Sequence, residues 1–404
     1  MKTGNQLDLN PVKEMNILLM NAGSSSVKWK LFEEQSEELI AKGSIERMMN
    51  PGSSFEIKFK DQVYEETIDN LSYEKAAEMI IEKIQEMKIT SLDKIKAVGH
   101  RVVAGGEKFT KATKIDESNF EDLEGMKDFA PLHNPMETRY IKLMQDVMPN
   151  TPQYAVFDSK FFLDIPEFNA IYSLPYEYTK KYQIRRYGEH GISHTYLTKR
   201  TAELLSMDQN KINMIALHLG GGASIAAIKN GKAYDTSMGF APLTGLTMGT
   251  RAGDVDPSLV PFLMNKLEMS AEEVLMMLNQ KSGLLGVSEL SSDMRDLAAK
   301  QDQDQQVKLA IDIFVNRIVK YVAGYFVELG HVDAVVFAGG IGENNPWLRQ
   351  RIIEELAVLG LKMDVTLDNQ NQEGITSKEE SSAKILLVPT NEELEMIHQI
   401  KAEL

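Results

Sequence analysis

The chain has 404 residues, of which 43% are hydrophobic and 25% charged, and it carries a formal charge of −15 with no cysteine. This length predicts two domains, and the negative charge argues against nucleic acid or a membrane surface as a partner. The absence of cysteine excludes disulfides and thiolate chemistry. With no apolar segment typical of a secretory signal and no run of membrane-spanning length, we expect a cytoplasmic protein.

Apolar strand-like segments alternate with longer helical patterns, which predicts an α/β architecture. Strands are predicted at 16–21, 27–32, 95–103, 153–157, 212–219, 223–228, 333–338 and 384–388. Helices are predicted at 73–88, 120–129, 136–146, 194–206, 271–280, 305–329, 346–359 and 391–402. We expect the domain boundary near Asp158, giving domains 1–158 and 159–392, with a last helix at about 393–404 that packs back on the first domain.

Three glycine-rich turns follow apolar strands. The first lies in NILLMNAGSSSVKWKLF from Asn16 to Phe32, and the second in NMIALHLGGGASIAAIKNGKAYDTS from Asn213 to Ser237. The third, in FAGGIGENNPWLRQRIIEEL, is expected to be a loop that runs from a strand to a helix. Without a Cβ, such turns bring backbone N–H groups against an anion, although one of them alone is more simply a structural turn. Three together favour a nucleotide, and the first two, each a hairpin, suggest a duplication.

The missing motifs narrow the class of nucleotide site. The sequence contains no G-x-x-x-x-G-K-[ST], no G-x-G-x-x-G and no protein-kinase signature set. Two domains would therefore hold the nucleotide through hairpin turns, as in the actin-like ATPases.

Several basic and imidazole groups stand in compact motifs. Five of the seven histidines do so, namely His100, His133, His190, His194 and His218, and Arg251 lies in MGTRAGDVDP. Phosphoryl transfer needs such donors together with a divalent cation, because charge spreads over three equatorial oxygens in the transition state. Oxygen ligands for Mg²⁺ could come from Asn21, Asp158 and Glu392. A structural role is the alternative for His194, as a helix cap, and for Asp254 and Asp256, as ion-pair partners.

These motifs resemble those of the acetate kinase (acetokinase) family from about Met15 to the last helix. The matching segments are NAGSSSVK, GHRVV-GGE, PLHNP, VFDS, YG-HG-SH, HLG-GAS, DTSMGF-PL-GL-MGTR-GD-DP, GGIGEN and PTNEEL. The resemblance implies two duplicated actin-like (ribonuclease H-like) α/β domains that flank a nucleotide cleft, with nucleotide binding and dimerisation in the second. It also implies a homodimer that transfers phosphate reversibly from ATP to acetate, giving ADP and acetyl phosphate, with Mg²⁺ or, as a substitute, Mn²⁺.

The resemblance also implies roles for individual residues. Asn21 and Glu392 would hold Mg²⁺, and Asp158, His190, Arg251, Arg101 and His133 would act in catalysis. The substrate would meet Arg101, Val103, Leu132, Pro242 and the residue at position 189. The nucleotide would meet Lys28, His218, Leu219, Gly220, Gly221, Gly222, Asp293, Met294, Arg295, Gly340, Ile341, Gly342, Glu343 and Asn344. Because acetate is already ionised at neutral pH, we interpret Asp158 as orienting Mg²⁺, its waters or an arginine rather than as a general base.

Four positions depart from the family pattern. Ala104 and Phe162 stand where histidine is usual, Gly221 where asparagine is usual, and Glu189 where a phenylalanine walls the pocket for the substrate methyl group. A carboxylate there would oppose an anionic substrate unless it is paired, for which Arg185 or Arg186 are candidates.

Four hypotheses follow from these patterns. The first is an acetate kinase, and a close variant is a kinase for propionate or another short-chain carboxylate. A diverged paralogue of low activity is the third. A nucleotide-driven switch module of the actin or Hsp70 type is the fourth, although it would not need two arginines converging with His190.

Overall fold

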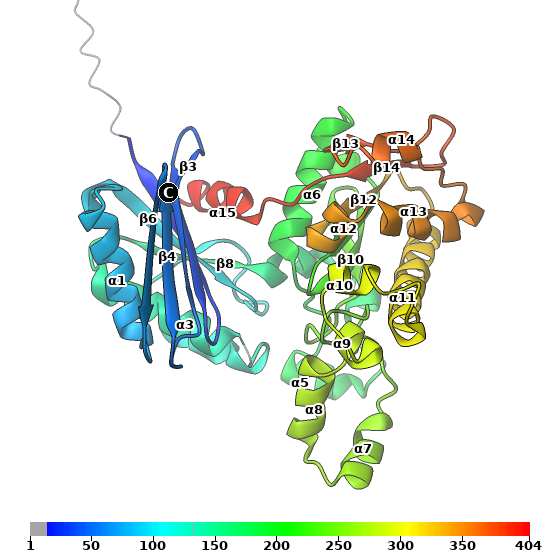
Figure 1. Ribbon diagram of the computed structural model, residues 1–404, viewed down its shortest axis with the longest axis horizontal. Coiled ribbons are helices and arrows are strands. Elements are labelled where there is room, and N and C mark those ends of the chain that lie inside the picture. The colour runs from blue at the N-terminus through cyan, green and yellow to red at the C-terminus, as the bar shows by residue number, and fades with distance from the viewer. Residues whose placement is uncertain (1–13, 132) are drawn as a thin grey trace, which may run out of the picture. The chain divides into compact units, whose positions relative to one another are not determined.

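A computed structural model describes residues 14–131 and 133–404 (Figure 1). The chain divides into two compact units. The first comprises the described residues up to 105, together with 109–157 and 396–404. The second comprises 106–108 and 158–395. Within the described residues, no helix combines the length and apolar composition that a membrane crossing requires.

The first unit contains an eight-stranded sheet in the order β5-β4-β3-β2-β1-β6-β8-β7. Its strands are β1 Asn16–Ala22, β2 Val27–Glu33, β3 Leu39–Glu46, β4 Ser53–Phe59, β5 Gln62–Ile68, β6 Ile95–Val102, β7 Thr113–Ile115 and β8 Gln153–Phe157. The second unit contains a six-stranded sheet in the order β11-β10-β9-β12-β14-β13. Its strands are β9 Met214–Leu219, β10 Ala223–Lys229, β11 Lys232–Thr236, β12 Ala334–Ala338, β13 Gly374–Ile375 and β14 Lys384–Leu387.

The two sheets repeat one strand pattern. In the first, β1 pairs antiparallel with β2 and parallel with β6, which pairs parallel with β8. In the second, β9 pairs antiparallel with β10 and parallel with β12, which pairs parallel with β14. A short antiparallel edge strand, β7 or β13, follows in each sheet. The glycine turns after β1 and β9 therefore occupy equivalent places, as a duplication predicts.

The helices of the first unit are α1 Tyr73–Glu86, α2 Phe120–Glu124 and α3 Asn134–Val147. Those of the second unit are α4 Glu167–Ala170, α5 Tyr176–Tyr182, α6 Gly191–Leu204, α7 Leu259–Leu267, α8 Ala271–Gln280, α9 Gly283–Ser288, α10 Met294–Ala298, α11 Gln305–Leu329, α12 Gly339–Asn344, α13 Pro346–Glu355 and α14 Val365–Asp368. The division between the units falls inside α15, Glu392–Lys401, after Glu395.

Alternation along the central strands separates two apolar layers in each unit. In the second unit, Ile215 and Leu217 of β9 face a core with α11, whereas Met214 and Ala216 face a core with α6. In the first unit, Leu18 and Met20 of β1 pack in a core with α1 and α3.

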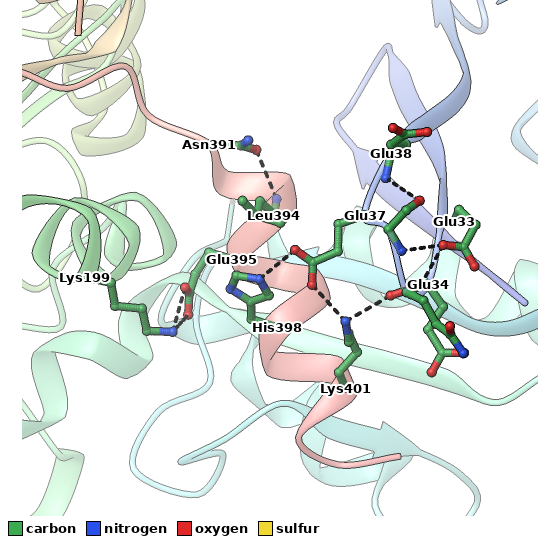
Figure 2. A network of polar contacts seen from close by, with 12 residues as sticks. Glu33, Glu34, Glu37, Glu38, Lys199, Asn391, Leu394, Glu395, His398 and Lys401 are labelled. Atoms are coloured by element: carbon green, nitrogen blue, oxygen red, sulfur yellow. Dashed lines mark hydrogen bonds and ion pairs between the residues drawn. The ribbon is translucent and has the colours of Figure 1, made fainter. Parts of the chain in front are cut away.

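Helix α15 covers part of the first sheet. A Cβ on Gly99 of β6 would lie 2.3 Å from the Ile400 side chain, so glycine allows the helix to approach this strand closely. Figure 2 shows Glu37 accepting hydrogen bonds from His398 and Lys401, at 3.1 and 2.8 Å. At the other end of α15, within the second unit, Lys199 donates to both carboxylate oxygens of Glu395.

The strongly periodic elements match their predicted positions. All eight predicted strands and eight predicted helices are present, and the helix predicted at 305–329 is α11 itself. The turn at Asn230-Gly231, between β10 and β11, has φ values of 52° and 72°, the left-handed conformation of a tight hairpin. The third glycine segment is not a loop, because β12 passes directly into α12, with Gly339 at φ 76°. A Cβ on Gly339 would lie 2.7 Å from the carbonyl oxygen of Leu219, so the chain can turn there only with glycine.

Candidate active site

The segment YGEHGISH places its histidine through two glycine contacts. A Cβ on Gly188 would lie 2.4 Å from the Phe162 ring, and one on Gly191 only 1.9 Å from the carbonyl oxygen of Asp158. Between them, His190 adopts a left-handed φ of 64°, which is uncommon outside glycine. The buried Asp158 carboxylate accepts a hydrogen bond from the backbone N–H of Ile192, at 3.2 Å. It thereby fixes the first turn of α6 beside His190.

The imidazole of His190 stacks on that of His218, with ring centroids 4.2 Å apart. Its Nδ1 lies 3.0 Å from the hydroxyl of Ser224 on β10. Its Nε2 faces Gly222, where a Cβ would lie 3.3 Å from Nε2 and 3.6 Å from Nη1 of Arg251. His190, His218 and Arg251 therefore meet at the glycine turn after β9.

The guanidinium of Arg251 also pairs with Glu189. Nη1 of Arg251 lies 3.6 Å from Oε2 of Glu189, and it donates to the carbonyl oxygen of Pro242 at 3.1 Å. The Glu189 side chain is 5% exposed, so its charge is sequestered rather than solvated. Arg185 pairs with Glu107 at 3.2 Å instead, and Arg186 donates to the backbone of Thr236. Arg251 is thus an ion-pair partner of Glu189, which the sequence did not suggest.

The loop that carries Arg251 is held by the neighbouring aspartates. Asp254 accepts hydrogen bonds from the backbone N–H of Gly245 and the hydroxyl of Tyr321, at 2.8 and 2.6 Å. Asp256 accepts from the backbone N–H of Ser258. Both aspartates are structural, as the sequence allowed, and they act through hydrogen bonds.

Apart from Lys28, the residues expected around the nucleotide lie in the second unit. The turn Gly220–Gly222 is closed by a hydrogen bond from Gly220 N–H to the Gly222 carbonyl, and Leu219 contacts Gly342 of α12. Gly340 is exposed, whereas Ile341 packs in the core. Within α12, Asn344 donates to the carbonyl of Gly340, and Glu343 accepts from the N–H groups of Gly339 and Thr390.

In the segment 293–295, two charged residues form an ion pair and the residue between them is buried. Asp293 caps α10, and Arg295 contacts its carboxylate at 2.6 Å. Hydrogen bonds from Arg295 lower the pKa of Asp293 to about 2, so this exposed carboxylate is ionised at neutral pH. The side chain of Met294 is buried in the core.

Apart from Glu392, the remaining predicted residues belong to the first unit. Asn21 and Arg101 stand near the carboxyl ends of the parallel strands β1 and β6, the usual edge for ligands in α/β sheets. Exposed Lys28 lies opposite Asn21 in the β1–β2 hairpin and 3.8 Å from Glu46. His133 occupies the N-cap position of α3. Leu132 lies outside the described residues.

In the first unit, hydrogen bonds connect the segment of Val103 and Ala104 to the start of α3. The side-chain amide of Asn134 bonds both the N–H and the carbonyl of Ala104, and Glu137 accepts from the N–H of Val103. His100 is structural, because burial lowers its pKa to about 4 and its Nε2 bonds Gln153 at 2.8 Å.

The expected magnesium ligands have suitable chemistry and come from different units. Asn21 is the last residue but one of β1 in the first unit, and Glu392 begins α15 in the second. Among residues 14–131 and 133–404, no group of three or more histidine, aspartate or glutamate side chains is arranged to hold a metal ion.

Sequence reasoning missed the hydroxyl and guanidinium groups that support the site. Ser193 lies 2.8 Å from Nδ1 of His218 and 2.6 Å from the hydroxyl of Thr390. Arg349 of α13 is almost fully buried, donates to the carbonyls of Gly342 and Glu343, and contacts Asp368 at 2.8 Å. Ser193 falls within a family motif, but Arg349 gave no signal, because an arginine in a helix is usually a surface residue.

Comparison with known proteins identifies the family. The model of the Acetokinase family matches residues 16–399. The chain belongs to this family. The acetate kinase of Limosilactobacillus fermentum is 46% identical over 388 residues, covering 95% of this chain and 98% of the relative.

Solved structures agree with this family and with the predicted fold. A propionate kinase from Francisella tularensis is 39% identical with a TM-score of 0.91, covering 95% of this chain and 98% of its own. The acetate kinase of Porphyromonas gingivalis is 38% identical with a TM-score of 0.90, covering 96% and 99%. The expected α/β fold of duplicated actin-like halves is confirmed.

We predict that Arg349→Met destabilises the second unit by about 3–5 kcal/mol, because it leaves the buried Asp368 without its cationic partner. Arg351→Met is the matched control, since Arg351 pairs with Asp312 on the surface and should matter by at most about 1 kcal/mol. Urea unfolding of both variants measures the difference. Equal losses for the two would contradict the role assigned to the buried arginine.

Proposed function

We propose that this protein transfers the γ-phosphoryl group of ATP reversibly to the carboxylate of acetate, giving acetyl phosphate and ADP. The observation that carries the proposal is the meeting of His190 Nε2 and Arg251 Nη1 at Gly222, beside the glycine turn after β9, in a chain of the acetokinase family. Membership of that family supplies the substrate class, and the site supplies donors suited to a phosphoryl group.

The chemistry needs little covalent help from the protein. One oxygen of acetate, already ionised, attacks the γ-phosphorus, and the bond from this phosphorus to the β–γ bridging oxygen breaks, so that ADP leaves with the electron pair. Negative charge on the equatorial oxygens is met by a hydrogen bond from His190 and by the guanidinium of Arg251. Arg101 would hold the acetate carboxylate and His133 would add a donor nearby, while Lys28 and the glycine turns would contact phosphates.

The Mg²⁺ expected for this reaction fits the chemistry of the candidate ligands. Asn21 and Glu392 supply an amide and a carboxylate oxygen, which a hard cation prefers, and Asp158 would orient the ion's waters. When bound, the ion would neutralise phosphate charge, and Mn²⁺ would serve in its place. We place the reaction in the cytoplasm, where ATP and acetate are available.

The proposal is tested by trapping acyl phosphate with hydroxylamine in the presence of ATP and Mg²⁺, using acetate, propionate, butyrate and a dicarboxylate. We expect hydroxamate with acetate, and some with propionate, because one methylene changes specificity by only about 1–3 kcal/mol. ATP hydrolysis without hydroxamate from any acid would overturn the proposal and favour a nucleotide-driven switch.

Arg251→Ala should lower kcat in this assay by at least about 10²-fold, because a cation facing the transferring group is lost. The matched control is Arg200→Ala, since Arg200 pairs with Glu373 at 2.7 Å on the surface of α6. Circular dichroism checks that both variants fold. A kcat that falls equally in both, or in neither, would count against the role of Arg251.

Glu189 places a buried carboxylate beside the guanidinium of Arg251, and its charge opposes the approach of a second carboxylate, that of acetate. Replacing Glu189 by Gln removes the charge and keeps the shape, whereas Glu189→Phe also adds an apolar wall. We expect both changes to lower KM for acetate by roughly 3- to 10-fold, because about 1 kcal/mol of repulsion between the two carboxylates is removed. A fall with Phe alone would assign the effect to the wall, and an unchanged KM in both would show that Glu189 does not affect acetate binding.

We further propose that the second unit forms a homodimer through an α7–α8 apolar surface, defined as Leu259, Phe262, Leu267, Leu275 and Met276. Phe262 and Met276 are each 53% exposed, and helix α7 contains no buried residue. Exposed apolar side chains concentrated on two contacting helices are typical of a protein interface.

Sedimentation velocity should give a dimer for the unaltered protein and a monomer for the double variant Phe262→Glu/Met276→Glu. The control is Val358→Glu, which places the same charge on a 91% exposed side chain outside α7 and α8. A dimer that persists in the double variant would locate the interface elsewhere.

A further inference from the structure

The buried hydroxyl of Ser224 contacts two histidines, namely His194 in helix α6 and His190 at the N-cap of that helix. The Ser224 side chain on β10 is fully buried, and its Oγ lies 3.0 Å from Nδ1 of His190 and 2.8 Å from Nε2 of His194. His190 is the proposed phosphoryl ligand, whereas the proposed mechanism gives His194 no role. The serine hydroxyl has one proton to share between two rings, so the protonation of one ring restricts that of the other.

The ring of His194 is neutral in this setting. It is fully buried, and its centroid lies 6.4 Å from that of Phe161 and 5.7 Å from that of Phe162. Burial, with a smaller contribution from nearby His218, lowers the pKa of His194 to about 3. At any working pH the ring therefore has one N–H and one bare nitrogen.

The surroundings decide which nitrogen of His194 carries the proton. Its Nδ1 is buried and has no hydrogen-bond partner among residues 14–131 and 133–404, whereas its Nε2 contacts Ser224. Buried N–H groups without an acceptor are rarer than bare acceptors, so the proton belongs on Nε2, which donates to the serine oxygen. The hydroxyl proton of Ser224 is then directed to Nδ1 of His190.

We propose that His194, acting through Ser224, holds His190 in the tautomer whose proton is on Nε2. His194 is then a positioning residue, and the chain of donors runs from His194 through Ser224 to the nitrogen that faces Gly222 and Arg251. The importance of this tautomer rests on the proposed phosphoryl transfer. Phosphoryl oxygens only accept hydrogen bonds, so the opposite tautomer would turn a lone pair towards them.

The test begins with the tautomer itself, measured without turnover. In protein labelled with ¹⁵N-histidine, NMR distinguishes a protonated from a bare ring nitrogen, and a His190→Gln variant assigns the signals. We expect His190 to show a protonated Nε2 and a bare Nδ1, and to become a mixture of tautomers in Ser224→Ala and His194→Leu. In His194→Gln, an amide N–H can replace the donor, so the wild-type pattern should return. A proton on Nδ1 of His190 in the unaltered protein would overturn the proposal.

Kinetics in the hydroxamate assay supply the second measurement. Ser224→Ala and His194→Leu should lower kcat by about 10-fold or more while KM for acetate changes less than about threefold, with His194→Gln recovering most of the loss. Values of kcat within twofold of the unaltered protein in folded Ser224→Ala and His194→Leu would also overturn it. An unaltered protein that makes no hydroxamate contradicts the proposed function, whereas the NMR result judges the tautomer separately.

Discussion

The close approach of Gly191 to the carbonyl oxygen of Asp158 is the contact on which the site in the second unit depends. Because no side chain fits between them, α6 can begin directly against the 3-10 turn that follows β8. This position lets the Asp158 carboxylate accept from Ile192 and leaves His190 to turn into the left-handed conformation. The imidazole is therefore aimed by backbone packing, which is more rigid than a surface loop.

Around this contact, the site is assembled from short-range constraints that support one another. The stacked rings of His190 and His218 each form a hydrogen bond with a serine hydroxyl. Because Gly222 has no side chain, the space between it, His190 and Arg251 stays open. A binding site for a highly charged group benefits from such fixed donors, because little reorganisation is needed when the charge arrives. The guanidinium of Arg251 also forms an ion pair with the Glu189 carboxylate, so its positive charge is partly compensated before any substrate binds.

The sequence predicted the parts of this protein that have strong local signals. Continuous apolar runs identified β1, β9 and β12, and the three-and-four spacing of α11 gave its full extent. The polar strand β5 was missed because most of its residues are exposed, so it lacks an apolar face. Helix α7 was missed because none of its residues is buried, and helix α12 because it is short and rich in glycine.

The candidate site was predictable only as a set of residue types. Motifs named His190, Arg251 and Glu189, but the pairing of the last two depends on long-range packing that spacing does not encode. Hydroxyl partners such as Ser224 were also hidden, because serine beside a glycine turn is explained equally well by the turn itself.

The placement of α15 has a consequence for synthesis. Its residue Ile400 packs over Gly99 in the middle of the first sheet, about three hundred positions earlier in the chain. During translation, the surface of β6 around Gly99 stays uncovered until the residues of α15 have left the ribosome. The apolar surface around Gly99 is therefore shielded only after α15 has been made, which lengthens the interval in which chaperones can bind that surface.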